Sequence, residues 1–102
     1  MKLPGNMQNM MQQAQKMQAK LQEDISAIRV AAGAGGGMVT VRMDGNKRVL
    51  GVKIEPDVAG DVEMLQDLVT AACNEAFNRA EEESRQKMSG MLGGMGLPPG
   101  LF

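Results

Sequence analysis

A stretch near the middle of the chain alternates apolar and polar residues on either side of a turn dipeptide. Residues 36–56 read GGMVTVRMDGNKRVLGVKIEP, and Asp44-Gly45 separates the two alternating arms. A period of two is typical of a strand with one buried face, and Asp-Gly between two such arms signals a hairpin. The pattern predicts strands over about 38–44 and 47–55, joined by a tight primed turn or by one that is two residues longer.

The alternation also assigns the two faces of this hairpin. On the first arm Val39, Val41 and Met43 share one face, which we expect to point at the core. On the second arm we expect Leu50, Val52 and Ile54 at the core, opposite Lys47, Val49, Lys53 and Glu55. Pro56 ends the second strand, because proline has no backbone N–H to donate to a sheet.

A shorter alternating segment precedes the hairpin. Residues 26–32 place Ile28, Val30 and Ala32 on one face and predict a third strand. The run GAGGG at 33–37 follows. A dinucleotide-binding GxGxxG would need glycine at Met38, and a nucleotide P-loop would need Gly-Lys-Ser/Thr, which is absent. The run therefore predicts a turn between strands.

Both ends of the sheet segment lead into helical patterns. Apolar residues recur at spacings of 3, 4, 3 and 4 at Met7, Met10, Ala14, Met17 and Leu21. This heptad-like seam predicts a helix over about 6–24, capped by Asn6. The seam suits packing on its own domain or on a dimer mate. A membrane-surface helix is the alternative, but its polar face would be mainly neutral Gln, which argues against it.

A longer helix is expected over about 61–88, with Asp61 as its N-cap. Its predicted seam is Val62, Leu65, Val69, Ala72 and Ala76, broadened by Leu68, Cys73, Phe77 and Ala80. No apolar residue follows Ala80 until Met88, so the helix should project beyond its core by about 12 Å. We expect residues 1–88 to form a single α+β domain and residues 89–102, rich in Gly and Pro, to form a flexible tail.

Composition excludes several classes of protein. The 102 residues contain no His, Trp or Tyr, and Cys73 is the only cysteine. Without histidine the commonest general base and metal ligand are missing, and without aromatic platforms base stacking is poor. Cys73 reads as a small core residue. We therefore expect no enzyme, no cofactor, no metal and no small-molecule substrate. Because no apolar run is long enough to span a membrane, we expect a cytoplasmic protein.

The net charge of −1 conceals a strong polarity along the chain. Residues 1–22 hold three lysines and no acid, and residues 25–56 hold five cations and two acids. Residues 57–88 hold three cations and eight acids. The non-core face of the predicted sheet carries Arg29, Arg42, Lys47 and Lys53. That face is either an ordinary solvated surface, a surface that contacts phosphates, or a covered interface.

The cations of the two helices differ in their expected partners. In the second helix each cation has a glutamate four residues earlier, as Glu75–Arg79, Glu81–Arg85 and Glu83–Lys87. This is the favourable orientation for helix ion pairs. Lys16 and Lys20 lie one turn apart and repel each other, and only Lys20 has an acid, Asp24, one turn away. If the protein binds DNA, the first helix and the basic sheet face are expected to contact phosphates before the second helix.

The order of these elements resembles the YbaB/EbfC family of bacterial nucleoid-associated DNA-binding proteins. The resemblance is carried by MQQAQKMQAKLQ (11–22), GMVTVRMDG (37–45), VKIEP (52–56), EMLQDLVTAACNEAFNRAEE (63–82) and GLPPG (96–100). These motifs cover nearly the whole chain, and five of them in this order are specific.

The resemblance implies a helix–three-stranded antiparallel sheet–helix protomer, and an intertwined homodimer with projecting helical arms. It implies double-stranded DNA binding with low sequence specificity and a role in nucleoid organisation or gene regulation. Binding by the arms would involve Lys2, Lys16, Lys20, Arg79, Arg85 and Lys87. The alternative is a protein-interaction module that recruits recombination or repair proteins through the Met-rich helix and the tail.

Overall fold

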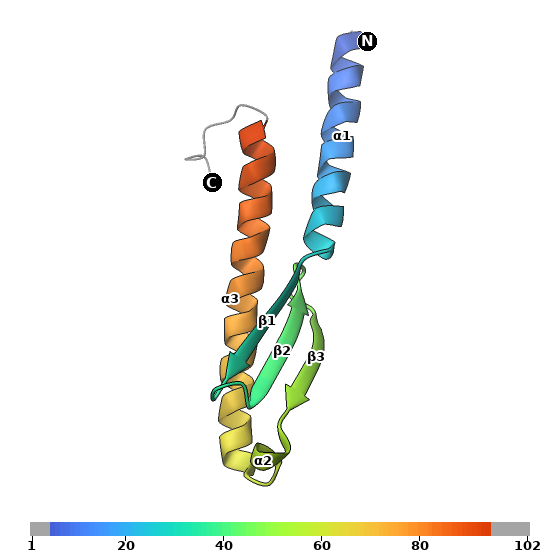
Figure 1. The fold of residues 1–102 in the computed structure, drawn as a ribbon. Coiled ribbons are helices and arrows are strands. Elements are labelled where there is room, and N and C mark those ends of the chain that lie inside the picture. Colours follow the sequence, from blue (N-terminus) through green and yellow to red (C-terminus); the bar gives the residue numbers. More distant parts are fainter. Residues whose placement is uncertain (1–4, 95–102) are drawn as a thin grey trace.

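The computed structural model describes residues 5–94 and shows a helix, three strands, a short helix and a long helix in that order (Figure 1). The elements are α1 (Gly5–Ser26), β1 (Arg29–Ala34), β2 (Val39–Asp44), β3 (Val49–Ile54), α2 (Pro56–Ala59) and α3 (Val62–Gly94). The expected order of helix, three-stranded antiparallel sheet and helix is confirmed. Lys2 and the end of the expected tail, 95–102, lie outside the described residues.

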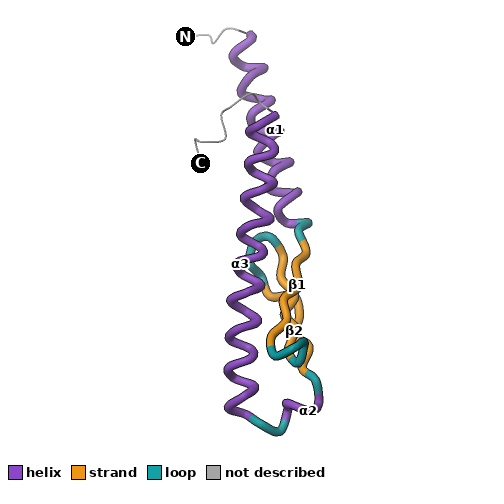
Figure 2. Tube along the Cα trace, turned by 60° about the vertical axis from the view of Figure 1, so that its left-hand side comes forward, coloured by secondary structure: helices purple, strands orange, loops and turns teal. Residues whose placement is uncertain are grey.

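The three strands form one sheet in the order β1-β2-β3, with both neighbouring pairs antiparallel. The long helix α3 lies along one face of this sheet, as both ribbon views show (Figures 1 and 2). It packs against β1 and β2, whereas β3 lies at the sheet edge beyond it. Within the described residues, α3 therefore covers β1 and β2 and leaves β3 uncovered.

The core lies between α3 and the first two strands. Its buried residues are Ala32, Val39, Val41 and Met43 from the sheet, Val58 from α2, and Ala72, Ala76 and Ala80 from α3. The three alanines follow one another at intervals of four, so they form one line along the helix. Their small side chains let the α3 backbone approach the sheet closely. Two members of the predicted seam, Phe77 and Val62, the first residue of α3, are instead exposed.

The predicted core face of β3 is wrong in two respects. Val49 lies opposite Met43, and an irregularity in the pairing at Arg42/Met43 shifts the phase of the strand. Val49 therefore joins Val52 and Ile54 on the α3 side of the sheet, and Leu50 leaves that side. These side chains are also not buried, since each is 40–46% exposed. The physical reason is that α3 does not extend over the edge strand.

The hairpin turn is the longer of the two expected forms. Lys47 N donates to Asp44 O at 3.1 Å and Asp44 N donates to Arg48 O at 3.0 Å. The Asp44 side chain stabilises this turn, because its Oδ1 accepts from Asn46 N at 2.9 Å and from Arg48 N at 3.0 Å. The positive φ of the turn, 66°, is at Lys47.

Several element ends differ from the expected ones. The first helix continues to Ser26, so β1 begins at Arg29, three residues later than expected. Pro56 ends β3 but also begins α2, where a missing N–H costs nothing at the first helical position. As predicted, Asp61 caps α3, and its Oδ1 accepts from Met64 N at 3.1 Å. The α3 helix continues to Gly94, so residues 89–94 are helical and not part of a flexible tail.

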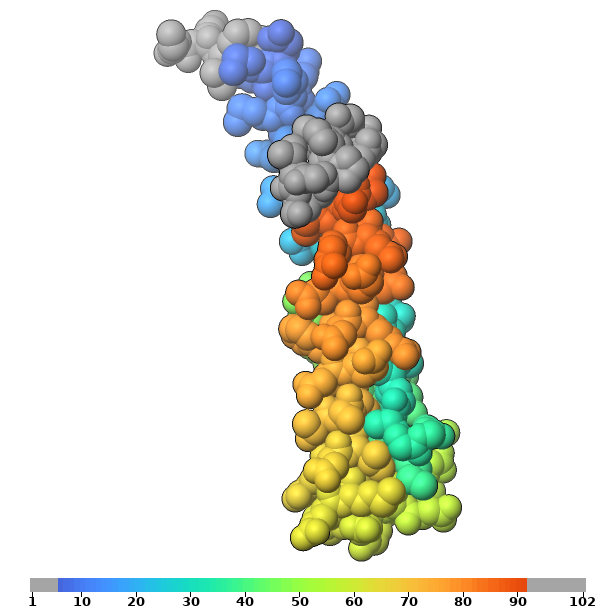
Figure 3. Space-filling model, turned by 90° about the vertical axis from the view of Figure 1, so that its left-hand side faces the viewer, coloured from blue at the N-terminus to red at the C-terminus, as the bar shows by residue number. Residues whose placement is uncertain are grey.

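The molecule is strongly elongated, with principal extents of 68 × 24 × 18 Å. Its radius of gyration is 19.6 Å, whereas a compact chain of this length has about 13 Å. Both α1 and the last turns of α3 extend past the sheet in the same direction (Figure 1). Figure 3 shows the first turns of α1 at the end of the molecule farthest from α2.

Candidate nucleic-acid interface

The two lysines of α1 are the most accessible cations of the expected interface. Lys16 and Lys20 are exposed and lie one turn apart on a helix that extends away from the sheet. Neither takes part in an ion pair among the described residues, and the expected partnership of Lys20 with Asp24 does not form. Both ammonium groups therefore remain available to an anion.

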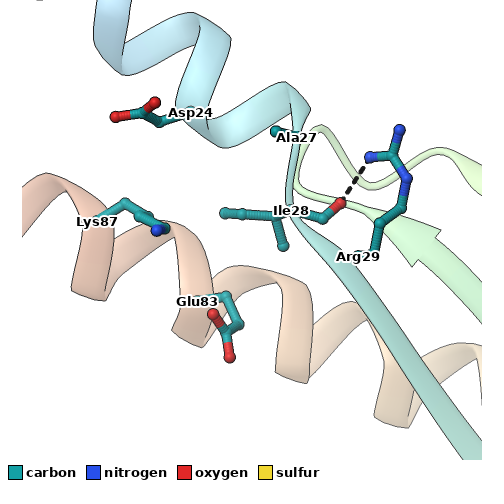
Figure 4. A pocket seen from close by; sticks show the side chains of 6 residues that line it. All are labelled: Asp24, Ala27, Ile28, Arg29, Glu83 and Lys87. Atoms are coloured by element: carbon teal, nitrogen blue, oxygen red, sulfur yellow. Dashed lines mark hydrogen bonds between the residues drawn. The ribbon is translucent and has the colours of Figure 1, made fainter.

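Arg29 forms hydrogen bonds with backbone carbonyl groups at the C-terminal end of α1. Its Nη1 donates to Ser26 O at 2.7 Å and to Ile28 O at 2.8 Å, the second of which is drawn in Figure 4. The last carbonyl groups of a helix carry partial negative charge and lack intrahelical donors. The guanidinium therefore caps α1, and part of its hydrogen-bonding capacity is already used.

Arg79 is also held by its own chain. Its Nε donates to Glu75 Oε1 at 3.2 Å, which confirms the expected pair, and its Nη1 donates to Ala31 O at 2.6 Å. The second bond ties α3 to the edge strand β1. Arg79 therefore contributes to packing between helix and sheet, and it lies on the side of α3 that faces β1.

The two remaining cations of α3 behave differently from each other. Arg85 pairs with Glu82 at 3.2 Å, one turn away but not with the expected Glu81. The expected pair of Glu83 with Lys87 does not form. Both side chains instead line a small polar hollow between the base of α1 and α3, together with Asp24 and Arg29 (Figure 4). Two acids and two bases balance there, so this hollow is not a basic site.

The cations of the hairpin divide between the two sides of the sheet. The register places Arg42 and Lys53 on the face opposite α3, where Arg42 extends over Gly51 and Lys53 lies 3.9 Å from Glu55. Lys47 was expected on the same face, and that prediction is wrong. Its Nζ lies 4.7 Å from the centre of the Phe77 ring, on the α3 side. The turn places Lys47 there because of its left-handed backbone conformation.

No cluster of side chains suited to metal binding is found in the part of the chain that the structure describes. Within residues 5–94, no three acidic or cysteine side chains come together in a way that could hold a metal ion. Within the same residues, no helix is both long enough and apolar enough to cross a bilayer. The structure places exposed positive charge on α1 and on the sheet face opposite α3.

The pattern of the sequence did not reveal two features of this surface. The first is the structural use of Arg29 and Arg79, whose partners are backbone carbonyls of Ser26, Ile28 and Ala31. Backbone acceptors leave no signal in the side-chain pattern. The second is the exposure of Phe77, which lies beside Lys47. Its apolar character had suggested burial, and nothing in the spacing indicates that α3 stops short of β3.

Comparison with known proteins agrees with this arrangement. The model of the YbaB/EbfC DNA-binding family matches residues 2–95. A nucleoid-associated protein of Acidobacterium capsulatum is 50% identical, over 97% of this chain and 98% of its own. A nucleoid-associated protein of Xylella fastidiosa is 46% identical, over 95% of this chain and 94% of its own.

The fold is found in a solved structure as well. The crystal structure of an uncharacterized protein from Helicobacter pylori superposes with a TM-score of 0.75. It covers 89% of this chain and 99% of its own, at 22% sequence identity, and so supports the fold alone. Because the family model spans almost the whole chain and relatives of about half-identical sequence match over nearly their full length, the chain belongs to the YbaB/EbfC DNA-binding family.

Proposed function

We propose that this protein binds double-stranded DNA and acts at the nucleoid, in its organisation or in gene regulation. The observation that carries the proposal is the pair Lys16 and Lys20, which are exposed on a helix that extends from the body and form no ion pair within residues 5–94. Membership of a DNA-binding family, and the names of its nucleoid-associated relatives, support it.

The proposed contacts are mainly with phosphates. Lysine is a flexible point charge, and contacts to the DNA backbone carry no sequence information. The protein should therefore bind with low sequence specificity. We rank Lys16 and Lys20 first, and Arg42 and Lys87 next. Lys53, Lys47 and Arg85 follow, because each has a partner within the chain. Arg29 and Arg79 serve mainly the fold. Lys2 keeps the role that the family resemblance implies.

We also propose that the protein is a homodimer. The side chains Val49, Val52 and Ile54 of β3 are exposed on the α3 side of the sheet, and Phe77 of α3, which contacts Lys47 of the hairpin turn, is exposed as well. We term these four residues the open apolar face. An exposed apolar patch along an unpaired edge strand favours association. The core of the protomer is also small, since Val39, Val41 and Val58 are its largest fully buried side chains. A second copy would cover the open apolar face and enlarge this core.

In such a dimer the two copies would present two pairs of projecting helices. Each protomer already directs α1 and the end of α3 to the same side of the sheet. We therefore propose that these helices are the arms that grip DNA, with the joined sheets as the body that spaces them.

A binding isotherm on labelled duplex DNA at several salt concentrations tests the proposed function. We expect tight binding at low salt and a steep linear fall of log affinity with log salt, by about 0.9 for each phosphate contacted. Duplexes of unrelated sequence should bind within a few-fold of one another. Absence of any complex at low salt, with folded protein, would contradict DNA binding.

One observation favours a second candidate function. Met7, Met10 and Met11 of α1 are 47–66% exposed, and Met side chains adapt to varied partners. The protein could then be a module that recruits recombination or repair proteins. A stoichiometric complex with one such protein that survives nuclease treatment, in a variant that no longer binds DNA, would support this alternative.

A further inference from the structure

Gly45 lies where three elements meet, at the end of the hairpin turn nearest to α1 and α3. It is buried, and a Cβ atom built on it would overlap the carbonyl oxygen of Ile25 in the last turn of α1. That Cβ would also lie 3.0 Å from both the carbonyl carbon and Cγ2 of Ile25. Gly45 does not have a positive φ, so this position requires glycine for lack of space and not for backbone freedom.

Polar bonds hold the same three elements together. Ser84 Oγ of α3 donates to Gly45 O at 3.1 Å, and Asn46 Nδ2 donates to Ser26 Oγ at 3.1 Å. The end of α1 is thus bonded to the turn, and the turn is bonded to α3. We term Gly45, Asn46, Ser26, Ile25 and Ser84 the Gly45 junction.

Beyond this junction α1 has little support. Ile25 and Ile28 at its base are buried, whereas residues 6–16 are exposed throughout. The helix diverges from α3 with distance from the sheet (Figure 1). Its 22 residues form a rod of about 33 Å. A rotation of about 10° at the base would therefore move the tip by about 6 Å.

We propose that the Gly45 junction fixes the direction of α1 relative to α3, and that Gly45 is a positioning residue for DNA binding. A methyl group at this position forces the end of α1 away from the turn by roughly an ångström, because a backbone carbonyl cannot rotate aside as a flexible side chain does. If the base of the rod rotates, this small shift grows along α1, so Lys16 is displaced and the tip is displaced farther. This inference rests on the proposed function.

The test compares Gly45→Ala with Gly60→Ala. A Cβ on Gly60 meets nothing within 4 Å, and its φ of −83° suits alanine, so the control carries the same chemical change without the clash. The distance between nitroxide labels is measured by pulsed electron paramagnetic resonance. The labels sit on Gln13→Cys of α1 and Gln86→Cys of α3, in a Cys73→Ser background. Labelled chain is mixed with excess unlabelled chain, so that each assembly holds one labelled protomer.

For Gly45→Ala we expect the mean label distance to shift by about 3 Å or its distribution to broaden, because Gln13 lies nearer to the base than the tip does. We expect duplex affinity to fall fivefold or more. Gly60→Ala should match the parent in both. An unchanged distance distribution in folded Gly45→Ala would overturn the inference, as would a shifted distance with unchanged duplex affinity. If the parent itself binds no duplex, the proposed function fails, whereas the label distances still report on the junction.

A second variant covers the case in which Gly45→Ala does not fold. Asn46→Ala combined with Ser84→Ala removes both polar bonds and adds no atoms to the junction. We expect this variant to keep its helix content and to show a broader distance distribution with at least threefold weaker duplex binding. A distribution as narrow as that of the parent would contradict the junction's role.

Discussion

At the scale of single residues, positively charged side chains serve two different purposes in this protein. Arg29 and Arg79 donate to backbone carbonyls of their own chain, whereas Lys16 and Lys20 extend into solvent without partners among the described residues. Arginine suits the first task because its planar group has five donors, and lysine suits flexible phosphate contact. Charge alone therefore does not rank these residues as candidates for DNA contact. The ranking depends on whether each charged group already has a partner within the chain.

The residue-scale prediction concerns Arg29→Ala. Loss of the bonds to Ser26 O and Ile28 O should lower the free energy of unfolding by about 1–2 kcal/mol, because bonds from a charged donor to helix-end carbonyls are lost. Urea unfolding followed by circular dichroism measures this change.

Lys53→Ala is the matched control for Arg29→Ala, since Lys53 is an exposed cation whose pair with Glu55 is 3.9 Å long. A surface pair of this kind is worth little, so the control should change stability by less than about 0.5 kcal/mol. Equal stability of the two variants would show that Arg29 does not cap α1 in solution.

At the scale of elements, the two long helices have opposite characters. The helix α1 carries a seam of apolar residues that stays largely uncovered, and its lysines have no ion-pair partner among the residues that the structure describes. The helix α3, in contrast, is packed through its alanine line and is acidic. The arginines of α3, Arg79 and Arg85, are paired with glutamates one turn away. A negatively charged duplex should therefore be attracted mainly by α1, and α3 should limit how closely it approaches.

The element-scale prediction is that charge reversal on α1 weakens duplex binding more than charge reversal on α3. Lys16→Glu with Lys20→Glu should weaken duplex binding by tenfold or more and reduce the salt dependence by about 2 for each α1 helix engaged. Arg85→Glu with Lys87→Glu reverses the same number of charges on α3 and serves as the matched control. Its effect should be smaller, because Arg85 is already paired with Glu82. Fluorescence anisotropy over a salt series measures both, and the opposite order would contradict the assignment to α1.

At the scale of the whole molecule, the chain is elongated and leaves an apolar part of its sheet uncovered. It is 68 Å long, its sheet has only three strands, and one apolar edge of that sheet is not covered by any described element. Domains of this size bury a modest fraction of their surface and often gain stability by association. The open apolar face is where a second copy would add most to the core.

The prediction at this scale is that Val52→Asp with Ile54→Asp disrupts the proposed dimer. Two carboxylates on the open apolar face would have to be desolvated at the interface, so light scattering should report a monomer. Lys53→Asp lies on the same strand but points to the opposite face, and it should remain dimeric. A dimeric double variant would place the interface elsewhere.

Much of the fold could be predicted because its signals are local. The alternation around Asp44-Gly45 gave the hairpin, the Met7-to-Leu21 seam gave α1, and Asp61 marked the start of α3. Each of these depends on backbone geometry within a few residues of the signal. The ends of the helices and strands were predicted less exactly. Helix ends depend on caps such as Arg29, whose side chain bonds to α1 from the next element, β1.

The candidate site was predictable only in part. The sequence shows that Lys16 and Lys20 have few acids nearby, and the structure leaves them exposed. The sequence could not show that the Lys47 side chain contacts Phe77, since that contact joins residues thirty positions apart. Nor could it show that Glu82, and not Glu81, would pair with Arg85, because both lie within one helical turn of it.

The amino-acid sequence by itself therefore determined the order and type of the elements, the polarity of charge along the chain and the absence of histidine chemistry. Only the tertiary structure decided which apolar residues are covered. Val52 and Val41 are the same residue type on facing strands, yet one is exposed and the other buried, because α3 crosses β2 and not β3. The tertiary structure also revealed why Gly45 must be glycine, since the atom that excludes a side chain belongs to Ile25, twenty residues away.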